Sequence, residues 1–438
     1  MYTAIVAKLK GVRKHTNADR LLVATVYGNQ VVVGLDAKEN DPGIYFPSDG
    51  RLSEEYCKAN DLIGYKDEKT GERKGGYFDA NRKVRCQKFR GEKSDGFFMP
   101  LDSLYFTGIN ITNLKEGDQF TELGGIKICE KYITKHTRNS FATGKIKREK
   151  AKVFTSFHEH IDTEQFMYNL DRIKTGSLLT LTEKVHGTSA RSSYARAEYN
   201  LPQWKKIVNV LRPTFKTAGW EFVSGTRRVV LDNEGFEDPT KSGYYGDNEF
   251  RQKYHDTFKN NLKKGETIYY EIVGWAGPDK PIMPIADNAV LKDKEFVKKY
   301  GDTTCFKYGC VNGTNDIYVY RISLSNEDGF EVDYSWEAVK ERCYELGVKH
   351  VKEIAPSFLF NGNRDELKEL VESVTEGESL IDPSHIREGV VVRIENGKHF
   401  YALKNKGFCF KVLEGIIKEN DSVVDIEESQ DFAEGPQV

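Results

Sequence analysis

The sequence has few cysteines, and their arrangement suits neither a disulfide framework nor a zinc site. Its seven cysteines are scattered, odd in number and include no Cys-x-x-Cys pair. Such a set predicts reduced thiols. There is also no run of about 18 apolar residues, and residues 1–20 lack the apolar core of a signal peptide. We therefore expect a cytoplasmic protein that does not enter a membrane.

The sequence also lacks the two commonest glycine-rich nucleotide motifs. No Gly-x-Gly occurs, and no Gly-x-x-x-x-Gly-Lys-Ser/Thr occurs. These absences exclude a Rossmann dinucleotide site and a P-loop. No internal repeat with a period of about 20 to 50 residues is visible either.

Neither sign of charge is in excess over the whole chain. Its 438 residues include 65 Lys or Arg and 67 Asp or Glu, a net charge of -2. This balance hides two opposite segments. Residues 126–155 carry nine Lys or Arg against two Glu, a net of +7, and residues 412–438 carry eight acids against one Lys, a net of -7. The basic segment is interpreted equally well as a solvated linker or as a segment that contacts phosphates.

Local patterns predict two folded domains. Up to residue 125, short β-rich runs separated by turn residues predict a small closed β-barrel. Beyond residue 156, helical and β patterns mix, which predicts an α+β domain with a largely antiparallel sheet. Helical faces are expected within 248–264, 336–346 and 367–374, and strands at 177–182, 267–273, 317–324, 390–394 and 399–403. The predicted order is a barrel domain (1–125), a basic linker (126–155), an α+β domain (156–411) and an acidic tail (412–438).

One lysine is a candidate covalent nucleophile. Lys184 follows the predicted strand 177–182, and Gly187 comes three residues later. A lysine at a strand end suits nucleophilic catalysis, and a nearby glycine lets the backbone approach a ligand. Taken alone, a surface lysine before a turn would be the simpler interpretation.

Two acids lie in strands that are otherwise apolar. Glu271 is embedded in the apolar and aromatic run 267–275, and Glu388 begins the run 388–393. A buried carboxylate costs several kcal/mol unless it is paired or binds a metal, so each placement requires a reason. An edge-strand acid facing water is the alternative for either residue.

Two lysines lie close to Glu388 in the expected hairpin. Lys404 and Lys406 alternate, so they point to one face of a strand, and residues 396–398 mark the turn. A two-residue turn would place Glu388 opposite Asn405. A three-residue loop with Gly397 as a left-handed bulge would place Glu388 opposite Lys404. We predict the second register because it gathers the acid and the lysines on one pocket face.

Four motifs in order resemble a known superfamily. They span 184–188, 270–274, 388–393 and 403–406, and they look like nucleotidyltransferase motifs I, III, IV and V of the covalent ligases and capping enzymes. His186, a histidine two residues after Lys184, resembles the pattern of the RNA ligase 2 and RNA-editing ligase branch. This resemblance covers roughly residues 155–411. In addition, 12–23 is similar to the opening of tRNA-binding OB-folds, and 88–97 resembles the N-terminal OB domain of nick-sealing RNA ligases.

The resemblance implies an ATP-dependent RNA ligase. Its fold would be an N-terminal OB-type β-barrel followed by a mixed, largely antiparallel, ATP-grasp-like ligase domain. Lys184 would attack the α-phosphorus of ATP to form lysyl-AMP, the adenylate would pass to a 5'-phosphate, and a 3'-hydroxyl would displace AMP. The attacking lysine must be neutral, a form that nearby cations favour.

The resemblance also assigns roles to individual residues. Glu271 and Glu388 would hold one Mg²⁺ or Mn²⁺ or its waters. Lys404 and Lys406 would contact the α-phosphate, and His186 the phosphate or the leaving pyrophosphate. The nucleotide site would further include Glu183, Gly187, Arg227 or Arg228, and Tyr320, with Tyr318 as the alternative aromatic. The arginines lie further from Lys184 than expected, which an insertion around residues 202–219 would explain.

The expected partner is RNA, as a nicked duplex or as ends held on a template, and the protein is expected to be a monomer. The candidate RNA-contacting residues are Lys145, Lys147, Arg148 and Lys150 in the basic segment, with Lys88 and Arg90 in the N-terminal domain. The alternatives are a GTP-dependent capping guanylyltransferase and a non-catalytic RNA-binding protein built on a ligase scaffold. Capping is disfavoured by His186 and by the leading OB-like segment, and the retained motif residues disfavour the non-catalytic protein.

Overall fold

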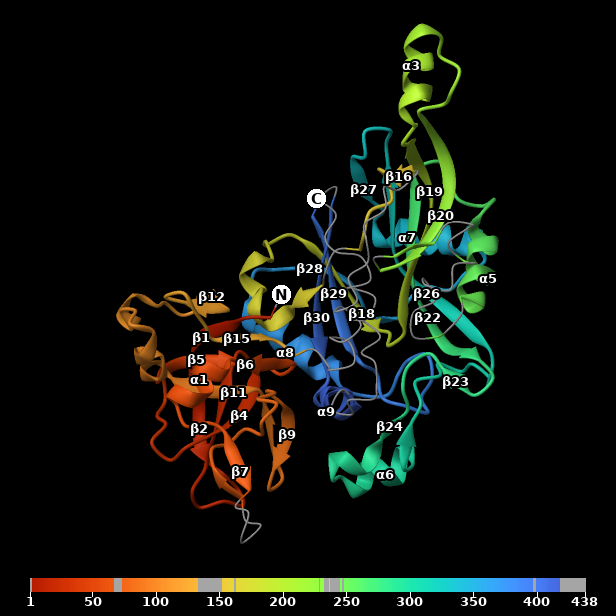
Figure 1. Cartoon of the computed structure of the whole chain (residues 1–438). Helices are drawn as coiled ribbons and strands as arrows, with labels where there is room; N and C mark the ends of the chain where they lie inside the picture. Colours follow the sequence, from red (N-terminus) through yellow and green to blue (C-terminus); the bar gives the residue numbers. More distant parts are fainter. Residues whose placement is uncertain are drawn as a thin grey trace. The chain divides into compact units, whose positions relative to one another are not determined.

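The structure is a computed structural model of the chain (Figure 1). It describes residues 2–66, 73–132, 152–160, 163–227, 229–231, 236, 245, 248–396 and 399–417. Most of the basic segment and of the acidic tail therefore lies outside the described residues. The chain divides into two compact units. The first unit is Met1–Ile133 with Lys411–Glu419, and the second is Thr134–Phe410 with Asn420–Val438.

The first unit is built from short strands. Its larger sheets are four-stranded, with β1 (Ala4–Lys8), β5 (Pro42–Phe46), β11 (Phe97–Pro100) and β12 (Gln119–Phe120), and three-stranded, with β2 (Lys10–Lys14), β3 (Leu22–Val26) and β4 (Asn29–Val33). Two-stranded pairs complete it: β6 (Gly50–Leu52) with β15 (Cys129–Lys131), β7 (Gly64–Lys66) with β8 (Arg73–Gly75), β9 (Cys86–Phe89) with β10 (Glu92–Asp95), and β13 (Glu122–Leu123) with β14 (Ile126–Lys127). The strands described in this unit do not join into one closed sheet, so the expected barrel is not confirmed.

The core of the first unit forms around one short helix. α1 (Glu54–Ala59) begins after Ser53, whose side chain accepts a hydrogen bond from the Tyr56 amide and so caps the helix. The Tyr56 ring is fully buried, and its hydroxyl donates to Ser103 Oγ at 2.8 Å. Phe46 and Leu52 pack in the same cluster. Two 3-10 helices follow, Leu101–Thr107 and Ile111–Asn113.

The second unit contains two large sheets that lie beside each other in Figure 1. The eight-stranded sheet contains β16 (Lys152–Phe154), β19 (Thr188–Tyr199), β20 (Ala218–Thr226), β21 (Val230–Leu231), β22 (Glu266–Gly277), β23 (Lys280–Pro281), β26 (Asn315–Ser325) and β27 (Glu331–Asp333). The five-stranded sheet has the order β17 (Glu164–Gln165), β30 (His399–Lys406), β29 (Gly389–Asn396), β18 (Leu178–Lys184) and β28 (Glu353–Leu359). Within these sheets the described pairings are antiparallel except β17 with β30, as a largely antiparallel α+β domain requires.

Three helices of the second unit bury the faces that the sequence predicts. α5 (Glu249–Phe258) buries Phe250, Tyr254 and Phe258. α7 (Trp336–Leu346) buries Trp336, Val339 and Cys343, and α8 (Arg364–Thr375) buries Leu367 and Val371. The remaining elements of this unit are α3 (Gln203–Leu211), α6 (Lys294–Tyr300), β24 (Ala286–Asp287), β25 (Thr303–Thr304) and the 3-10 helices Phe166–Tyr168, Leu170–Arg172 and Asn288–Leu291. α9 (Phe408–Ile417) begins in the second unit, and from Lys411 onward it belongs to the first. In the part of the chain that the structure describes, no helix is long and apolar enough to cross a membrane.

The register of the β29–β30 hairpin differs from both expected registers. Asn396 pairs with His399, and Gly389 pairs with Lys406. The Glu388 carbonyl accepts a hydrogen bond from the Gly407 amide at 2.9 Å, so Glu388 lies opposite neither Asn405 nor Lys404. The prediction placed Asn396 in the turn, whereas it is the last paired residue of β29. The hairpin is therefore shifted, and Lys406 is the lysine beside Glu388.

Candidate active site

Three neighbouring strands bring Lys184, Glu388 and Lys406 together. Lys184 pairs with Gly389, and Gly389 pairs with Lys406, so the three residues form a row across β18, β29 and β30. Glu388 precedes this row. Its Oε1 lies 2.8 Å from Lys184 Nζ and 3.1 Å from Lys406 Nζ. The predicted nucleophile, acid and phosphate lysine thus meet at one point.

The Glu388 carboxylate is fully buried, with 0% of its side chain exposed. Burial alone would raise its pKa, but the ammonium groups of Lys184 and Lys406 outweigh burial and hold the pKa well below its usual value. His186 Nδ1 lies 3.6 Å from the other carboxylate oxygen. Glu388 is therefore ionised and is surrounded by positive or potentially positive groups.

Gly187 makes room for a neighbouring strand. A Cβ atom at this position would lie 2.4 Å from the Ile272 carbonyl oxygen, a distance that no side chain tolerates. The sequence-based interpretation was that this glycine lets the backbone approach a ligand, and Gly187 does line the cavity described below. Its closest neighbour, however, is β22. The next residues pair with that strand, Thr188 with Ile272 and Ser189 with Glu271.

Glu271 faces a cavity. The residues on either side of it in β22, from Glu266 to Gly274, are buried, while Glu271 itself is only partly buried. It lines a cavity together with seven other residues of the predicted site, namely Glu183, Lys184, Gly187, Arg227, Tyr320, Lys404 and Lys406. The structure therefore gathers residues that lie as far apart in the sequence as Glu183 and Lys406.

Arg227 returns to the site through a long hairpin. β19 begins shortly after Lys184, and α3 follows β19 in the sequence. β20 then runs antiparallel to β19, back to the pair that Thr226 forms with Ala190. Figure 1 shows α3 at the far end of this hairpin. Arg227 therefore lies at the cavity despite its distance in sequence, and the expected insertion is this hairpin end. Arg228 lies outside the described residues.

A family comparison and a structural comparison point to the same group of proteins. The model of the RNA ligase family matches residues 178–413, which is more than half of the chain. The chain belongs to the RNA ligase family. The match contains each of the four motifs on which the resemblance rests. The comparison with curated proteins finds no relative.

Solved structures of a Naegleria gruberi RNA ligase share this fold. A mutant with AMP and Mn superposes with a TM-score of 0.55 at 17% identity, over 93% of this chain and 97% of that one. A mutant with ATP and Mn gives 0.51 at 17% identity, over 94% and 98%. The protein with PPi gives 0.53 at 17% identity, over 92% and 96%. At 17% identity, this likeness shows the fold of the chain and no more than the fold.

The two candidate aromatic residues of this RNA ligase family member lie in different cavities. Tyr320 lines the cavity of Lys184, and its hydroxyl lies 3.0 Å from Ser189 Oγ. Tyr318 lines a second cavity. The choice of Tyr320 for the nucleotide site thus agrees with its position, while its role stays a prediction.

The structure adds two cavity residues to which the sequence pattern assigned no role in the nucleotide site. His160 stacks edge-on against Tyr320, with ring centroids 4.8 Å apart, and burial together with nearby cations lowers its pKa well below the usual value. Arg393 is 2% exposed, donates to the Tyr320 carbonyl, and places its guanidinium 4.4 Å from the Trp336 ring. His160 adds an aromatic ring to the lining of the ligase's cavity, and Arg393 adds a cationic side chain. An arginine inside an apolar strand was the available signal for Arg393.

Tyr308 supports the loop that follows the ligase's lysine. Its hydroxyl accepts a hydrogen bond from the His186 amide at 2.7 Å, and its ring is 3% exposed. Its φ of 50° is unusual for a non-glycine residue. Phe306 and Phe410 contact the His186 ring from two sides, with centroids 4.9 and 4.7 Å away. His186 is therefore held in a fixed orientation beside Glu388.

The residues present fit a phosphate-bound divalent metal better than a metal held by protein alone. Among the described residues, no group of three or more His, Cys, Asp or Glu side chains could hold a metal. Mg²⁺ usually takes one or two carboxylates and completes its shell with waters and substrate phosphates. The two predicted ligands suit that arrangement, because Glu271 lines one cavity with Lys184, Lys404 and Lys406, and Glu388 pairs with two of these lysines.

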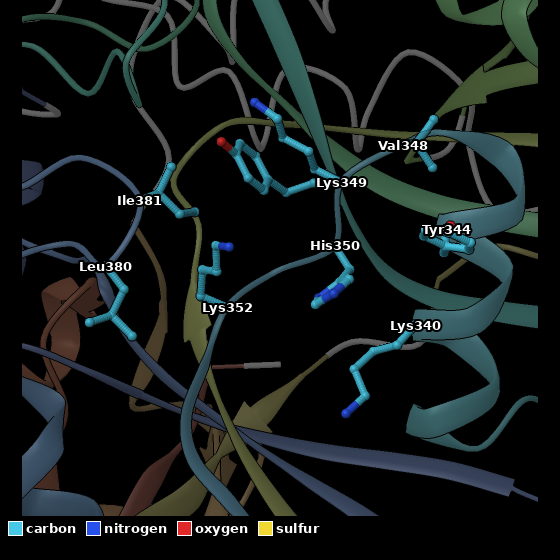
Figure 2. Close-up of a pocket in the computed structure, with 9 residues that line it drawn as sticks. Lys340, Tyr344, Val348, Lys349, His350, Lys352, Leu380 and Ile381 are labelled. Carbon is cyan, nitrogen blue, oxygen red and sulfur yellow. The ribbon is translucent and has the colours of Figure 1, made fainter.

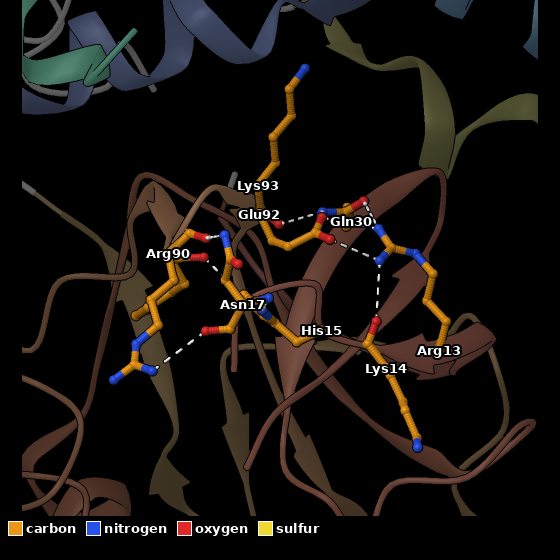
Figure 3. Close-up of polar contacts among 9 residues, drawn as sticks. Arg13, Lys14, His15, Asn17, Gln30, Arg90, Glu92 and Lys93 are labelled. Carbon is orange, nitrogen blue, oxygen red and sulfur yellow. Dashed lines mark hydrogen bonds and ion pairs between the residues drawn. The ribbon is translucent and has the colours of Figure 1, made fainter. Parts of the chain in front are cut away.

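The predicted RNA-contacting residues divide into two groups. Lys145, Lys147, Arg148 and Lys150 lie outside the described residues. Lys88 and Arg90 belong to the first unit of this RNA ligase family member, where β9 and β10 place Lys88 directly opposite Lys93. Figure 3 shows how the two motifs of this unit meet: the Asn17 side chain donates to the Arg90 carbonyl, and Arg13 pairs with Glu92. The motif segments 12–23 and 88–97 are thus neighbours in space.

Proposed function

We propose that this protein is an ATP-dependent RNA ligase that joins a 3'-hydroxyl to a 5'-phosphate at nicks in duplex RNA or in RNA held on a template. The observation that carries the proposal is the pairing of Lys184 and Lys406 with the buried carboxylate of Glu388. Membership of the RNA ligase family supports it. So does the likeness to solved ligase structures that hold AMP or ATP with Mn.

The residues of the cavity supply nucleophile, charge and position. Lys184 Nζ bonds to the α-phosphorus of ATP, the bond to pyrophosphate breaks, and the lysine's proton leaves. The resulting lysyl-AMP passes its adenylate to the 5'-phosphate of an RNA end and restores Lys184. The 3'-hydroxyl then attacks that 5'-phosphate, loses its proton, and AMP leaves. A divalent metal bound near Glu271 and Glu388 would neutralise phosphate charge.

The ammonium groups have distinct tasks in this scheme. In the ATP-free site, Glu388 holds Lys184 at 2.8 Å and so favours its charged form, which cannot attack. Lys406 shares the same oxygen. A phosphate that pairs with Lys406, together with a divalent metal held near Glu388, would take the counter-charge away from Lys184 and so make its neutral form accessible. Lys404 lines the same cavity and would hold the phosphate.

We further propose that the first unit is an RNA-binding domain of the OB type. Lys88 and Lys93 lie directly opposite each other on β9 and β10, so this hairpin carries two basic side chains side by side. Basic side chains gathered in this way suit contact with the phosphates of an RNA backbone. Arg90 lies at the exposed turn of the same hairpin.

Nucleotide transfer to the protein tests the proposal. We would incubate the protein with α-labelled ATP or GTP and Mg²⁺ or Mn²⁺, denature it, and measure retained label. Label from ATP is expected in the wild type and in Lys174→Ala, an exposed lysine of the same unit, and is expected to vanish in Lys184→Ala. Label from GTP alone would indicate a capping enzyme, and no label from either nucleotide would contradict both enzymes.

The substrate is tested separately from nucleotide transfer. A nicked RNA duplex with a 5'-phosphate should be sealed, and the same nick without that phosphate should not. Replacing Lys145, Lys147, Arg148 and Lys150 with alanine should lower nick binding and flatten its dependence on salt if these residues contact phosphates. An unchanged salt slope would identify the segment as a passive linker.

A further inference from the structure

A second cavity lies in the same unit as the Lys184 cavity and takes no part in the chemistry above. It has a volume of about 500 Å³. Figure 2 shows its three walls: Lys340 and Tyr344 on α7, the segment with Lys349, His350 and Lys352, and the stretch with Leu380 and Ile381. Basic, aromatic and apolar side chains thus line one hollow.

A single extended segment separates this cavity from the active-site cavity. Val351 lines the active-site cavity, while its neighbours His350 and Lys352 line the second one. The segment is fixed on both sides, because the Val319 amide donates to the Lys349 carbonyl and the Glu183 amide to the Lys352 carbonyl, each at 2.8 Å. A ligand in the second cavity would therefore lie immediately behind the wall of the catalytic site.

The lysines of the second cavity differ in how far they are already neutralised. Lys340 Nζ lies 2.7 Å from Glu353 and 2.8 Å from Glu337, and Lys349 Nζ lies 2.6 Å from Asp316. Lys352 is exposed, and no carboxylate of the described residues forms an ion pair with it. Lys352 is thus the cation that an incoming anion can pair with.

The aromatic side chain at the rim is unusually accessible. Tyr344 is 90% exposed on α7, and Leu380 across the cavity is 47% exposed. An inorganic anion would gain nothing from these surfaces. Aromatic rings that bases stack on, next to cations that hold the phosphates, are the usual means of binding a single nucleic-acid strand.

We propose that this cavity binds one nucleotide of the RNA substrate strand, with its base on Tyr344 and its phosphate on Lys352. The inference rests on the proposed RNA ligase function and adds a strand-binding site to it. An acidic peptide suits the cavity less well, because Glu337, Glu353 and Asp316 lie beside two of its lysines and would repel a run of carboxylates. A nucleotide brings one charge and one flat base, which match Lys352, to which no carboxylate in the described part of the chain pairs, and the exposed ring of Tyr344.

Equilibrium binding separates the two contacts. We would measure the affinity of a fluorescent single-stranded RNA with a 5'-phosphate, without ATP, over a series of salt concentrations. Lys352→Ala should weaken binding and reduce the slope of log K against log salt by about 1. Tyr344→Ala should weaken binding roughly tenfold with an unchanged slope, and Tyr344→Phe, which keeps the ring, should bind as the wild type does.

Exposed residues of the same unit provide matched controls. Lys298→Ala on α6 and Phe330→Ala, whose ring is 74% exposed, should leave both the affinity and the salt slope unchanged. All of these variants should take up label from ATP as the wild type does, because their side chains lie outside the Lys184 cavity.

The possible failures are distinguishable. A wild type that takes up no label from ATP contradicts the ligase function itself. If the wild type takes up label but Lys352→Ala and Tyr344→Ala bind RNA normally, the strand site is wrong. Loss of labelling in these two variants would show that the cavity merely supports the catalytic wall. If these two variants bound polyglutamate more weakly than the wild type but bound RNA as the wild type does, the cavity would be assigned to an acidic protein.

Discussion

Lys184 Nζ and Lys406 Nζ lie 2.8 and 3.1 Å from the same oxygen of Glu388. One buried carboxylate therefore serves two ammonium groups, so these three side chains together carry one positive charge. Charges interact more strongly in a buried site than in water. We therefore expect this cluster to favour a phosphate, and the following predictions test that arrangement.

Removing the charge of Glu388 should harm both stability and activity. Glu388→Gln leaves two ammonium groups without their carboxylate, so the free energy of unfolding should fall by about 3 kcal/mol. Transfer of label from ATP should fall at least a hundredfold. Adding Lys406→Met removes one of the two charges, so the double variant should recover part of the stability while labelling stays low. Urea unfolding and a labelling time course measure the two effects.

This pair of variants distinguishes an electrostatic role from a purely steric one. If Glu388 only filled space, Glu388→Gln would be as stable as the wild type and Lys406→Met would add its own cost. Additive effects in the double variant would therefore contradict the shared-carboxylate arrangement.

Gly389 should not accept a side chain. A Cβ atom there would lie 2.1 Å from the Asn405 carbonyl oxygen and 2.8 Å from the Lys406 Cα, both of them backbone atoms of β30. Gly389→Ala should therefore push β29 and β30 apart, lower the free energy of unfolding by about 1–3 kcal/mol, and slow labelling. Gly277→Ala is the matched control, since its Cβ would meet only the flexible end of Lys280 at 4.0 Å. Equal unfolding midpoints and labelling rates for the two variants would contradict this prediction.

Much of this site could be predicted because its residues stand in recognisable motifs. Lys184, Glu271 and Lys404 were found by their type and their neighbours, and the structure places all three at one cavity. The hairpin register could not be found in this way. The register depends on whether Asn396 lies in the turn or pairs with β30. In both cases Lys404 and Lys406 point to the same face of their strand.

The rest of the site depends on contacts between distant segments. His160 reaches the cavity because its ring packs against Tyr320, and Arg227 because β20 folds back along β19. No local pattern records either contact. In the first unit, short strands separated by turns were predicted, and the structure has such strands, for example β3 and β4, but how they close into sheets depends on long-range pairing. The expected closed barrel was for that reason the weakest fold prediction.

Arg393 should determine how well the site holds the nucleotide. Its guanidinium donates to the Tyr320 carbonyl and stacks on Trp336, and a lysine cannot reproduce a planar group that does both. Arg393→Lys should raise the KM for ATP about fivefold with a smaller change in kcat. Arg191→Lys is the control, because Arg191 is also buried and lies 4.2 Å from the Phe157 ring but does not line the cavity. A rise in KM in both variants would indicate a general loss of packing.

Glu92 should make the first unit sensitive to acid. Its carboxylate accepts hydrogen bonds from Arg13 at 2.8 and 3.0 Å and from Gln30 at 3.0 Å (Figure 3), and these bonds lower its pKa from 4.5 to about 2. Because the pKa is lower in the folded state, the carboxylate stabilises the fold above pH 4.5, and this stability is lost as the pH falls towards 2. Amide hydrogen exchange in β3, β4, β9 and β10, corrected for its intrinsic pH dependence, should show protection falling over that window.

Replacing the carboxylate should flatten this dependence. Glu92→Gln should be less protected than the wild type near neutral pH, and the two should converge towards pH 2, because protonation then removes the charge from the wild type as well. Glu116→Gln provides the control, since the one ion pair of Glu116 among the described residues is with Lys8, and both side chains are more than 40% exposed. Parallel pH profiles for the wild type and Glu92→Gln would show that Arg13 and Gln30 position the 12–23 and 88–97 segments without stabilising the Glu92 charge.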